Sequence, residues 1–288
     1  MKKTTEIQKA PDRLKVLEKM EQYERDGLFH LDLENDPPWK PLNHKKVNFL
    51  RKGLFAKIRR FIGYRMGRIF FTSQLRKKRI IFGKVKGLEH LQGFNSGAIV
   101  TCNHVSIMDS YAVLTAFEQI YSKWRFRLWK VVREGNFSYP GVVGFLMRNC
   151  DTLPINEREN QNIALTAKCM RAIKTLLKQN QKILIYPEQG MWWHYRKPRP
   201  TKDGAFLFAA KCKAPIIPCF LTFKDTDLIG NDGFNVQEMT LNFAPPIYPD
   251  ENLSTQENTK MLKEKNFEAW KDIYERTYGE ELTYTTIN

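Results

Sequence analysis

From residue 84 onward, short apolar runs alternate with segments of helical periodicity, and this alternation constrains the fold more than any other feature. Six runs have the length and composition of buried strands: residues 98–102, 126–132, 152–155, 182–186, 215–222 and 239–243. Five segments between or after them are predicted helices: residues 109–119, 139–147, 161–179, 205–211 and 254–278. Strands that alternate with helices form a parallel or mixed sheet covered on both faces. We therefore predict an α/β fold with a central, mostly parallel or mixed sheet flanked by helices.

The chain before this alternation divides into two further parts. Residues 1–36 hold a charged helix, expected at 10–26, and the start of a proline-rich connector. The thin apolar edge of this helix predicts loose packing. Residues 37–83 form a basic amphipathic segment, and residues 84–288 form the α/β domain with its C-terminal helix.

The formal net charge of the 288-residue chain is +16, and its position is more informative than its size. No acidic residue occurs between Pro37 and Leu88. The same stretch carries sixteen basic residues: Lys40, Lys45, Lys46, Arg51, Lys52, Lys57, Arg59, Arg60, Arg65, Arg68, Arg76, Lys77, Lys78, Arg79, Lys84 and Lys86. The rest of the chain is close to neutral overall.

Within this basic stretch, residues 54–71 have the pattern of a broad amphipathic helix. One face carries the apolar residues Leu54, Phe55, Ile58, Phe61, Ile62, Met66 and Ile69. A basic helix with aromatic residues suits the plane of an anionic membrane, and we predict membrane docking. The alternative is an amphipathic helix packed on the protein core. Nucleic acid fits the charge too, but no nucleic-acid-binding motif is present, so we expect no such partner.

The sequence predicts a peripheral protein on the cytoplasmic face of the cell membrane. No uninterrupted apolar run approaches the 18 residues typical of a transmembrane helix. The first residues are charged, so no secretion signal is expected. Five cysteines without a C-x-x-C spacing suit a reducing compartment and indicate neither a disulfide framework nor a metal site.

A histidine and an aspartate five residues apart follow the predicted strand at 98–102. Histidine has an unperturbed pKa near neutrality, so His104 suits proton transfer, and Asp109 suits holding its ring in the useful tautomer. Residues five apart on a regular helix diverge by about 140°. The pair therefore meets only if His104 lies on the loop before the helix, which Asn103 and Ser106, typical of helix starts, favour. The alternative is a structural histidine beside a helix cap.

Four blocks of sequence resemble motifs of the glycerophospholipid acyltransferase family, the lysophosphatidic acid acyltransferase type, and occur in the family's order. Residues 103–109 resemble its H-x4-D motif in the form N-H-x-S-x-x-D. Residues 153–158 are similar to the second block, 185–190 to the third and 214–219 to the fourth. The resemblance extends roughly from residue 84 to residue 249.

This resemblance implies an O-acyltransferase that moves a fatty acyl group from acyl-ACP or acyl-CoA to a hydroxyl of a lysophospholipid. His104 would deprotonate the hydroxyl and Asp109 would stabilise the imidazolium, so no protein nucleophile is required. The implied partners are an anionic membrane surface, the acyl carrier protein or coenzyme A thioester and the lysophospholipid. No metal or bound cofactor is implied.

We place five further residues of these blocks among the substrate-binding candidates. Asn103 and Ser106 flank His104; Ser106 lacks the G-x-S-x-G setting of a nucleophile, so we prefer a capping role for it. Arg158 resembles the second-block arginine associated with the acceptor's phosphate, which its planar fork suits. Glu188 either binds an acceptor hydroxyl or anchors its loop, and Gly190 would permit the turn.

The third block departs from the family's usual P-E-G-[ST]-R, because Gln189 follows the glutamate and the adjacent arginine is missing. Arg196 and Arg199, in the tryptophan-rich stretch 191–200, are candidates to replace that arginine. Lys202 resembles the lysine of the family's K-x-G turn, with a solvated lysine as the alternative. The same aromatic stretch is expected at the mouth of the site, facing a sugar or lipid headgroups.

The altered block leaves two other functions open. The acceptor could be a hydroxyl of a glycolipid or glycan. A non-catalytic membrane lipid-binding protein would keep the fold and the basic face, although retention of both His104 and Asp109 argues against it.

Overall fold

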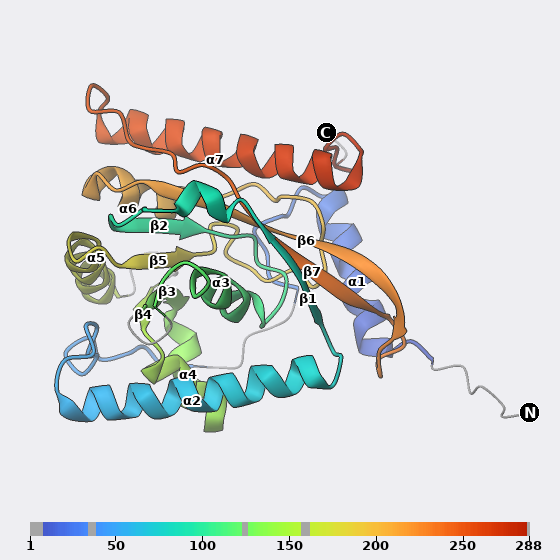
Figure 1. Ribbon diagram of the computed structural model, residues 1–288, viewed down its shortest axis with the longest axis horizontal. Coiled ribbons are helices and arrows are strands. Elements are labelled where there is room, and N and C mark those ends of the chain that lie inside the picture. Colours follow the sequence, from blue (N-terminus) through green and yellow to red (C-terminus); the bar gives the residue numbers. More distant parts are fainter. Residues whose placement is uncertain (1–7, 34–38, 123–125, 157–161, 287–288) are drawn as a thin grey trace, which may run out of the picture.

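The computed structural model describes residues 8–33, 39–122, 126–156 and 162–286. Within these residues seven strands form one mixed sheet in the order β1-β7-β6-β2-β5-β3-β4 (Figure 1). The strands are β1 (Ile81–Lys86), β2 (Ala98–Thr101), β3 (Leu128–Arg133), β4 (Thr152–Ile155), β5 (Lys182–Ile185), β6 (Ile216–Ile229) and β7 (Asn235–Phe243). The run from β6 to β4 is parallel, β7 is antiparallel to β6, and β1 is parallel to β7. The expected α/β fold with a mixed sheet is confirmed.

Helices flank this sheet, as the sequence predicted (Figure 1). The α-helices are α1 (Pro11–Arg25), α2 (Leu54–Arg76), α3 (Asp109–Phe117), α4 (Gly141–Asn149), α5 (Ile163–Lys178), α6 (Gly204–Cys212) and α7 (Thr255–Tyr278). Two short 3-10 helices, η1 (Leu88–Leu91) and η2 (Glu134–Ser138), follow β1 and β3.

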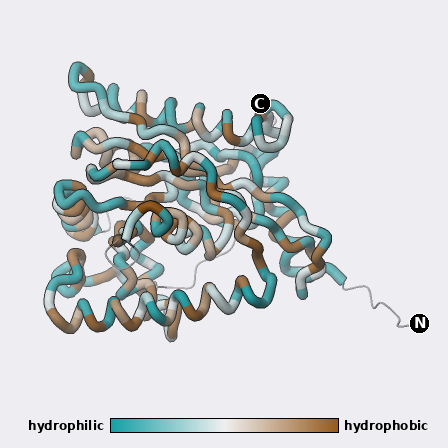
Figure 2. The backbone as a smooth tube through the Cα atoms, viewed as in Figure 1, coloured by the Kyte–Doolittle hydropathy of each residue, from teal (hydrophilic) through white to brown (hydrophobic). Residues whose placement is uncertain are grey.

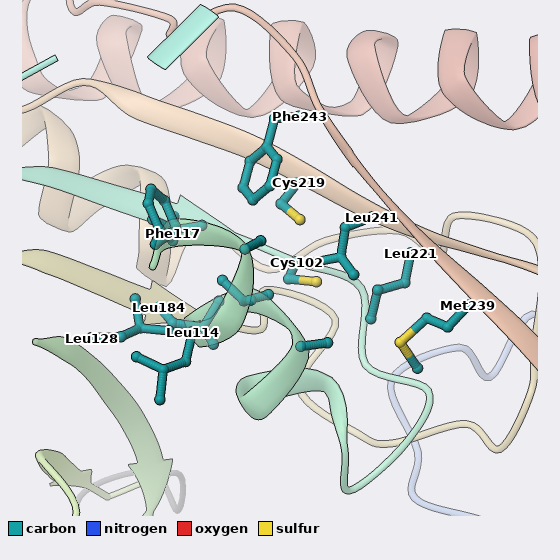
Figure 3. Close-up of a cluster of buried hydrophobic side chains, with 14 of the residues drawn as sticks. Cys102, Leu114, Phe117, Leu128, Leu184, Cys219, Leu221, Met239, Leu241 and Phe243 are labelled. Atoms are coloured by element: carbon teal, nitrogen blue, oxygen red, sulfur yellow. The ribbon is translucent and has the colours of Figure 1, made fainter. Parts of the chain in front are cut away.

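The central strands are apolar on both faces because helices cover both. Val100 and Leu184 belong to the buried cluster that includes α3, drawn in Figure 3, where Leu114 and Phe117 of that helix lie near Leu184. Their neighbours Ile99 and Ile183 belong to a second cluster with α5 and α6. Successive strand residues point to opposite faces, so a continuous apolar run supplies both clusters.

Helix α2 both packs on the core and exposes apolar side chains. Its inner face contributes Tyr64 and Phe71 to the α3 cluster, and its two inner glycines are buried. On the outer face Phe55 is 80% exposed and Phe61 is 60% exposed. Figure 2 shows hydrophobic residues recurring along the whole helix. Among the described residues, no helix combines the length and apolar character that crossing a bilayer requires.

Two features of the N-terminal part differ from the sequence prediction. Strand β1 was not predicted, and it begins at Ile81, inside the segment 37–83 that we assigned to membrane association. Helix α1 is not loosely packed. Its residue Glu24 is buried and accepts hydrogen bonds from the hydroxyl of Tyr195 at 2.8 Å and from Nζ of Lys197 at 2.7 Å. Buried polar partners far along the chain fix this helix, and hydrophobic periodicity does not report them.

The carboxyl ends of β2, β5 and β3 lie at one edge of the sheet, because these strands are adjacent and parallel. In open α/β sheets this is the edge at which ligands bind. The H-x4-D loop leaves β2 here, the third motif block leaves β5, and Arg133 ends β3.

Candidate active site

His104 lies on the loop that joins β2 to α3, as the pairing with Asp109 requires. Its ring atom Nδ1 lies 2.9 Å from Oδ2 of Asp109, the first residue of α3. The same carboxylate oxygen accepts the main-chain N–H groups of Val105 at 2.8 Å and Ser106 at 2.9 Å. Asp109 therefore fixes the main chain of the loop before its helix while holding the imidazole.

This geometry sets the chemistry that His104 can perform. Asp109 is fully buried, whereas the side chain of His104 is 24% exposed. A carboxylate accepts only, so Nδ1 carries the proton and Nε2 is left as the acceptor, the form required of a general base. The imidazolium formed after proton transfer would be stabilised by the carboxylate at 2.9 Å.

Tyr186, which the sequence analysis did not single out, fixes the plane of the histidine ring. The two rings are stacked, with centroids 4.0 Å apart and an interplanar angle of 15°. The Tyr186 hydroxyl lies 2.9 Å from Oγ of Ser110 on α3. Burial raises the pKa of Tyr186 well above its usual value, so it stays a neutral phenol. Its position directly after β5, within the third block, was the available signal.

Glu188 anchors the loop between β2 and α3, called here the catalytic loop. This is the second of the two roles considered for it. It is 2% exposed and accepts the main-chain N–H of His104 at 3.1 Å. It also binds Arg199 through that residue's main-chain N–H at 2.8 Å and its guanidinium at 2.9 Å. Its oxygens are thus engaged within the protein, which corrects their assignment to substrate.

Arg199 does not replace the missing third-block arginine as a substrate ligand. Its side chain is 1% exposed and also donates to the main-chain oxygens of Phe29, at 3.0 Å, and Gly190. Burial lowers its pKa, and the Glu188 carboxylate opposes that shift. The buried guanidinium of Arg199 therefore links the third block to the N-terminal segment.

The turn after Glu188 depends on a different residue from the one expected. Gln189 adopts the left-handed conformation with φ 67°, whereas Gly190 does not have positive φ. A Cβ atom at Gly190 would lie 2.7 Å from Oδ1 of Asp32. The glycine leaves room for this close approach of the N-terminal segment and is not the residue that makes the turn.

The tryptophan-rich loop is packed under the N-terminal segment instead of facing a ligand. Trp192 is fully buried against Phe29, and its ring N–H donates to the main-chain oxygen of Leu31 at 2.9 Å. Its own main-chain N–H donates to the main-chain oxygen of His104 at 3.0 Å. Trp192 therefore supports the loop that carries His104, and it does not face a sugar or headgroup as we expected of the aromatic stretch 191–200.

The remaining candidates are dispersed. The side chain of Asn103 is buried and pairs with both main-chain groups of Leu221, at 2.7 and 3.0 Å, so it fastens the loop to β6 instead of binding substrate. Oγ of Ser106 accepts the main-chain N–H of Met108 at 3.2 Å within the loop, and Met108, not Ser106, is the N-cap residue of α3. Arg196 pairs with Asp225 at 2.9 Å on the surface.

Lys202 and Arg158 are the two remaining candidates from the acceptor side. Lys202 has an exposed side chain, and its main-chain N–H donates to Pro187 in the third block at 2.8 Å. Arg158 lies outside the described residues. In the part of the chain that the structure covers, no group of three or more His, Cys, Asp and Glu side chains could hold a metal ion.

A cavity of about 130 Å³ opens between α2 and the sheet, close to the catalytic loop. Its lining is mostly apolar and comes from α2, α3, α4, β3, β4 and the loops before α3 and after α4: Gly63, Tyr64, Gly67, Arg68, Phe71, Ile107, Ser110, Tyr111, Leu114, Lys130, Val132, Leu146, Met147, Cys150 and Thr152. Ser110, which bonds to Tyr186, is part of this wall. The cavity and the stacked histidine are therefore separated by two side chains.

Comparison with known proteins gives sequence and fold relatives of one kind. A family model described as Acyltransferase matches residues 83–222. A chloroplastic 1-acyl-sn-glycerol-3-phosphate acyltransferase of Brassica napus is 26% identical over 168 residues, which is 57% of this chain and 44% of the relative. An uncharacterised acyltransferase of Schizosaccharomyces pombe is 28% identical over 185 residues, or 63% of this chain and 61% of the relative. This chain thus matches less than two thirds of either relative.

The fold is also found in a solved structure. The 1-acyl-sn-glycerophosphate (LPA) acyltransferase PlsC of Thermotoga maritima superposes with a TM-score of 0.51 and 18% sequence identity, over 79% of this chain and 81% of that chain. The family match extends over β2, β5 and the start of β6, so it contains the histidine–aspartate pair and the strand ends that support it. These matches support the glycerophospholipid acyltransferase family that the H-x4-D motif of this chain indicated.

Proposed function

We propose that this protein transfers a fatty acyl group from a thioester to a hydroxyl group, with His104 as general base and Asp109 as its orienting carboxylate. The observation that carries the proposal is the 2.9 Å contact between Nδ1 of His104 and the buried Asp109 carboxylate. It leaves Nε2 as a base on a partly exposed ring.

The reaction then proceeds without a protein nucleophile. Nε2 of His104 takes the proton of the acceptor hydroxyl as its oxygen attacks the thioester carbonyl carbon. The carbon–sulfur bond breaks when the tetrahedral intermediate collapses, and the thiolate takes the proton back from the imidazolium. The products are an ester and a free thiol, and the histidine returns to its starting state.

The donor in this proposal is acyl-ACP or acyl-CoA, and the acceptor is a lysophospholipid of the 1-acylglycerol-3-phosphate kind. The names of the Brassica napus and Thermotoga maritima relatives support this acceptor. The glycolipid alternative rested partly on an exposed tryptophan platform, and Trp192 is buried. We therefore keep the lysophospholipid as the acceptor.

The acyl chain of the donor would enter the apolar cavity beneath α2. Apolar walls are typical of lipid sites, and this cavity lies one side chain away from Tyr186, which stacks on His104. Gly67 supports the assignment, because it is buried on the inner face of α2 and a Cβ there would meet nothing within 4 Å. A helix-interior glycine costs about 1 kcal/mol relative to alanine. The open space that Gly67 leaves in the cavity offsets this cost if an acyl chain occupies it.

We propose that the protein works on the cytoplasmic face of the cell membrane, docked through α2. Phe55 and Phe61 project from the outer face of this helix, and the segment around it has no acidic residue. On α4, which packs against α2, Val142 and Val143 are more than half exposed. Exposed apolar side chains bordered by basic ones suit the headgroup region of an anionic bilayer.

The test is a transfer assay with labelled acyl donors and a panel of acceptors, comparing the wild type with His104→Ala. Labelled phosphatidic acid that is lost in the variant is the expected result. Ester found only on a glycolipid would overturn the acceptor. Turnover retained in the variant would overturn the role of His104. No turnover by a wild-type protein that still binds liposomes would favour the lipid-binding alternative.

A further inference from the structure

Arg133, at the carboxyl end of β3, faces a carboxylate from the N-terminal segment. Its Nη1 lies 2.5 Å from Oδ2 of Asp32, and its Nη2 lies 2.9 Å from Oδ1. This is the two-pronged arrangement in which arginine also binds phosphate. The side chains are 20% and 36% exposed, so the pair lies at the surface of the site.

The pair lies at the same edge of the sheet as the general base. Strand β5 separates β2 from β3, so the strand that leads to His104 and the strand that ends at Arg133 are about 10 Å apart. Asp32 lies against Gly190, two residues beyond Glu188, which holds the main-chain N–H of His104. The two groups that an acceptor with a hydroxyl and a phosphate requires, a base and a guanidinium, therefore lie at one edge of the sheet.

The N-terminal segment does not depend on the Asp32 carboxylate for its position. Lys19 donates to the main-chain oxygens of Asp32 at 3.2 Å and Leu33 at 2.8 Å, and Trp192 donates to that of Leu31 at 2.9 Å. The carboxylate can rotate away from Arg133 while the backbone stays in place. A partly exposed ion pair contributes little to stability, so its value for the fold alone is small.

We propose that Arg133 binds the phosphate of the acceptor and that Asp32 is a built-in competitor, occupying Arg133 until that phosphate replaces it. The inference rests on the proposed acyl transfer to a phosphorylated acceptor. A phosphomonoester carries a charge of about −1.5 to −2 at pH 7 and three acceptor oxygens, against one charge and two oxygens for Asp32. An acceptor without phosphate cannot displace the carboxylate. The pair thus selects phosphorylated acceptors.

The kinetic test compares lysophosphatidic acid with monoacylglycerol of the same chain length as acceptors. Asp32→Asn removes the competing charge and should lower KM for lysophosphatidic acid severalfold, with kcat unchanged. Arg133→Gln should raise that KM by about 10- to 100-fold, the effect of losing a charge-assisted contact. Neither change should alter KM for monoacylglycerol. Arg276→Gln, which removes an arginine–aspartate pair on α7, is the matched control.

A binding measurement keeps the test independent of turnover. Glycerol 3-phosphate, titrated calorimetrically, should bind Asp32→Asn more tightly than the wild type and Arg133→Gln most weakly, with Arg276→Gln equal to the wild type. This order would stand even if no acceptor were acylated, in which case only the proposed function fails. Equal binding by all four proteins overturns the inference. The inference is also overturned if Arg133→Gln lowers kcat equally with both acceptors while its thermal unfolding shows that the variant is folded.

Discussion

Oδ2 of Asp109 binds the imidazole of His104 at 2.9 Å and two main-chain N–H groups of the loop that carries it. One carboxylate oxygen thus sets both the ring and the path of the backbone beneath it. Asp109→Asn should lower kcat by about 10²- to 10⁴-fold, because the amide can still accept a loop N–H but cannot stabilise the imidazolium. Steady-state kinetics on the purified variant measure this.

The control for this prediction is Ser106→Ala, which removes the hydroxyl that accepts the N–H of Met108 but no charge. Loss of this one hydrogen bond should cost about 1 kcal/mol of stability and less than tenfold in kcat. A similar loss of kcat in both variants would mean that the loop, and not the charge of Asp109, limits the reaction.

Tyr186 offers a second test of how the histidine ring is held. Tyr186→Phe keeps a ring to stack on His104 but loses the contact with Ser110, so kcat should fall less than tenfold. Tyr186→Leu also removes the stack, found here at 4.0 Å, and should lower kcat further while KM changes little. Equal kcat values for the two variants would contradict a role for the stack.

Sequence patterns predicted the parts of this protein that depend on local periodicity. The strand at 98–102 and the helix from Asp109 were expected within a few residues, because burial on both faces and helical spacing leave a direct record in the sequence. Strand β1 was missed because its burial is partial and its basic residues extend the charged segment before it.

The candidate site was predictable only where its residues are close in sequence. His104 and Asp109 lie five residues apart, and a loop between them makes their contact possible. Glu188 and Arg199 were both suspected, but their mutual pairing depends on how the third block folds back under the N-terminal segment. The partners Asp32 and Arg133 are 101 residues apart, and no local pattern connects them. Contacts of this kind can be identified only from the folded structure.

Changing one partner of the buried pair Glu188–Arg199 should strongly lower stability. Glu188→Gln leaves the buried guanidinium without its counter-charge and should lower the free energy of unfolding by about 3–5 kcal/mol. Urea denaturation measures this change. The exposed pair of Lys263 and Asp203 provides the control, since Lys263→Gln should cost less than about 1 kcal/mol. Comparable losses in both variants would contradict a structural role for Glu188.

Gly67 should limit the length of acyl chain that the cavity admits. Gly67→Val places two methyl groups into the space that the glycine leaves open, so the variant should prefer donors several carbons shorter than the wild type does. Competition between labelled donors of different chain length measures the shift. In contrast, Gly63→Ala meets Sγ of Cys150 at 2.9 Å and should lower stability without the same change in preference. An unchanged preference in Gly67→Val would place the acyl chain elsewhere.

The outer face of α2 should govern binding to anionic membranes. Phe61 and Ile62 are 60% and 43% exposed, and replacing both by aspartate would put charge where the proposal places lipid, so the variant should not co-sediment with anionic liposomes. The matched control is the same change at Leu228 and Ile229 of β6, which are 40% and 50% exposed and belong to no basic segment. That control should bind as the wild type does.

The charge of the membrane gives a second test. Because each basic side chain near an anionic surface contributes about 1 kcal/mol, neutral liposomes should bind the wild type more weakly, and added salt should weaken its binding to anionic liposomes. Equal binding to neutral and anionic liposomes would mean that the exposed apolar residues act without the sixteen basic residues around them.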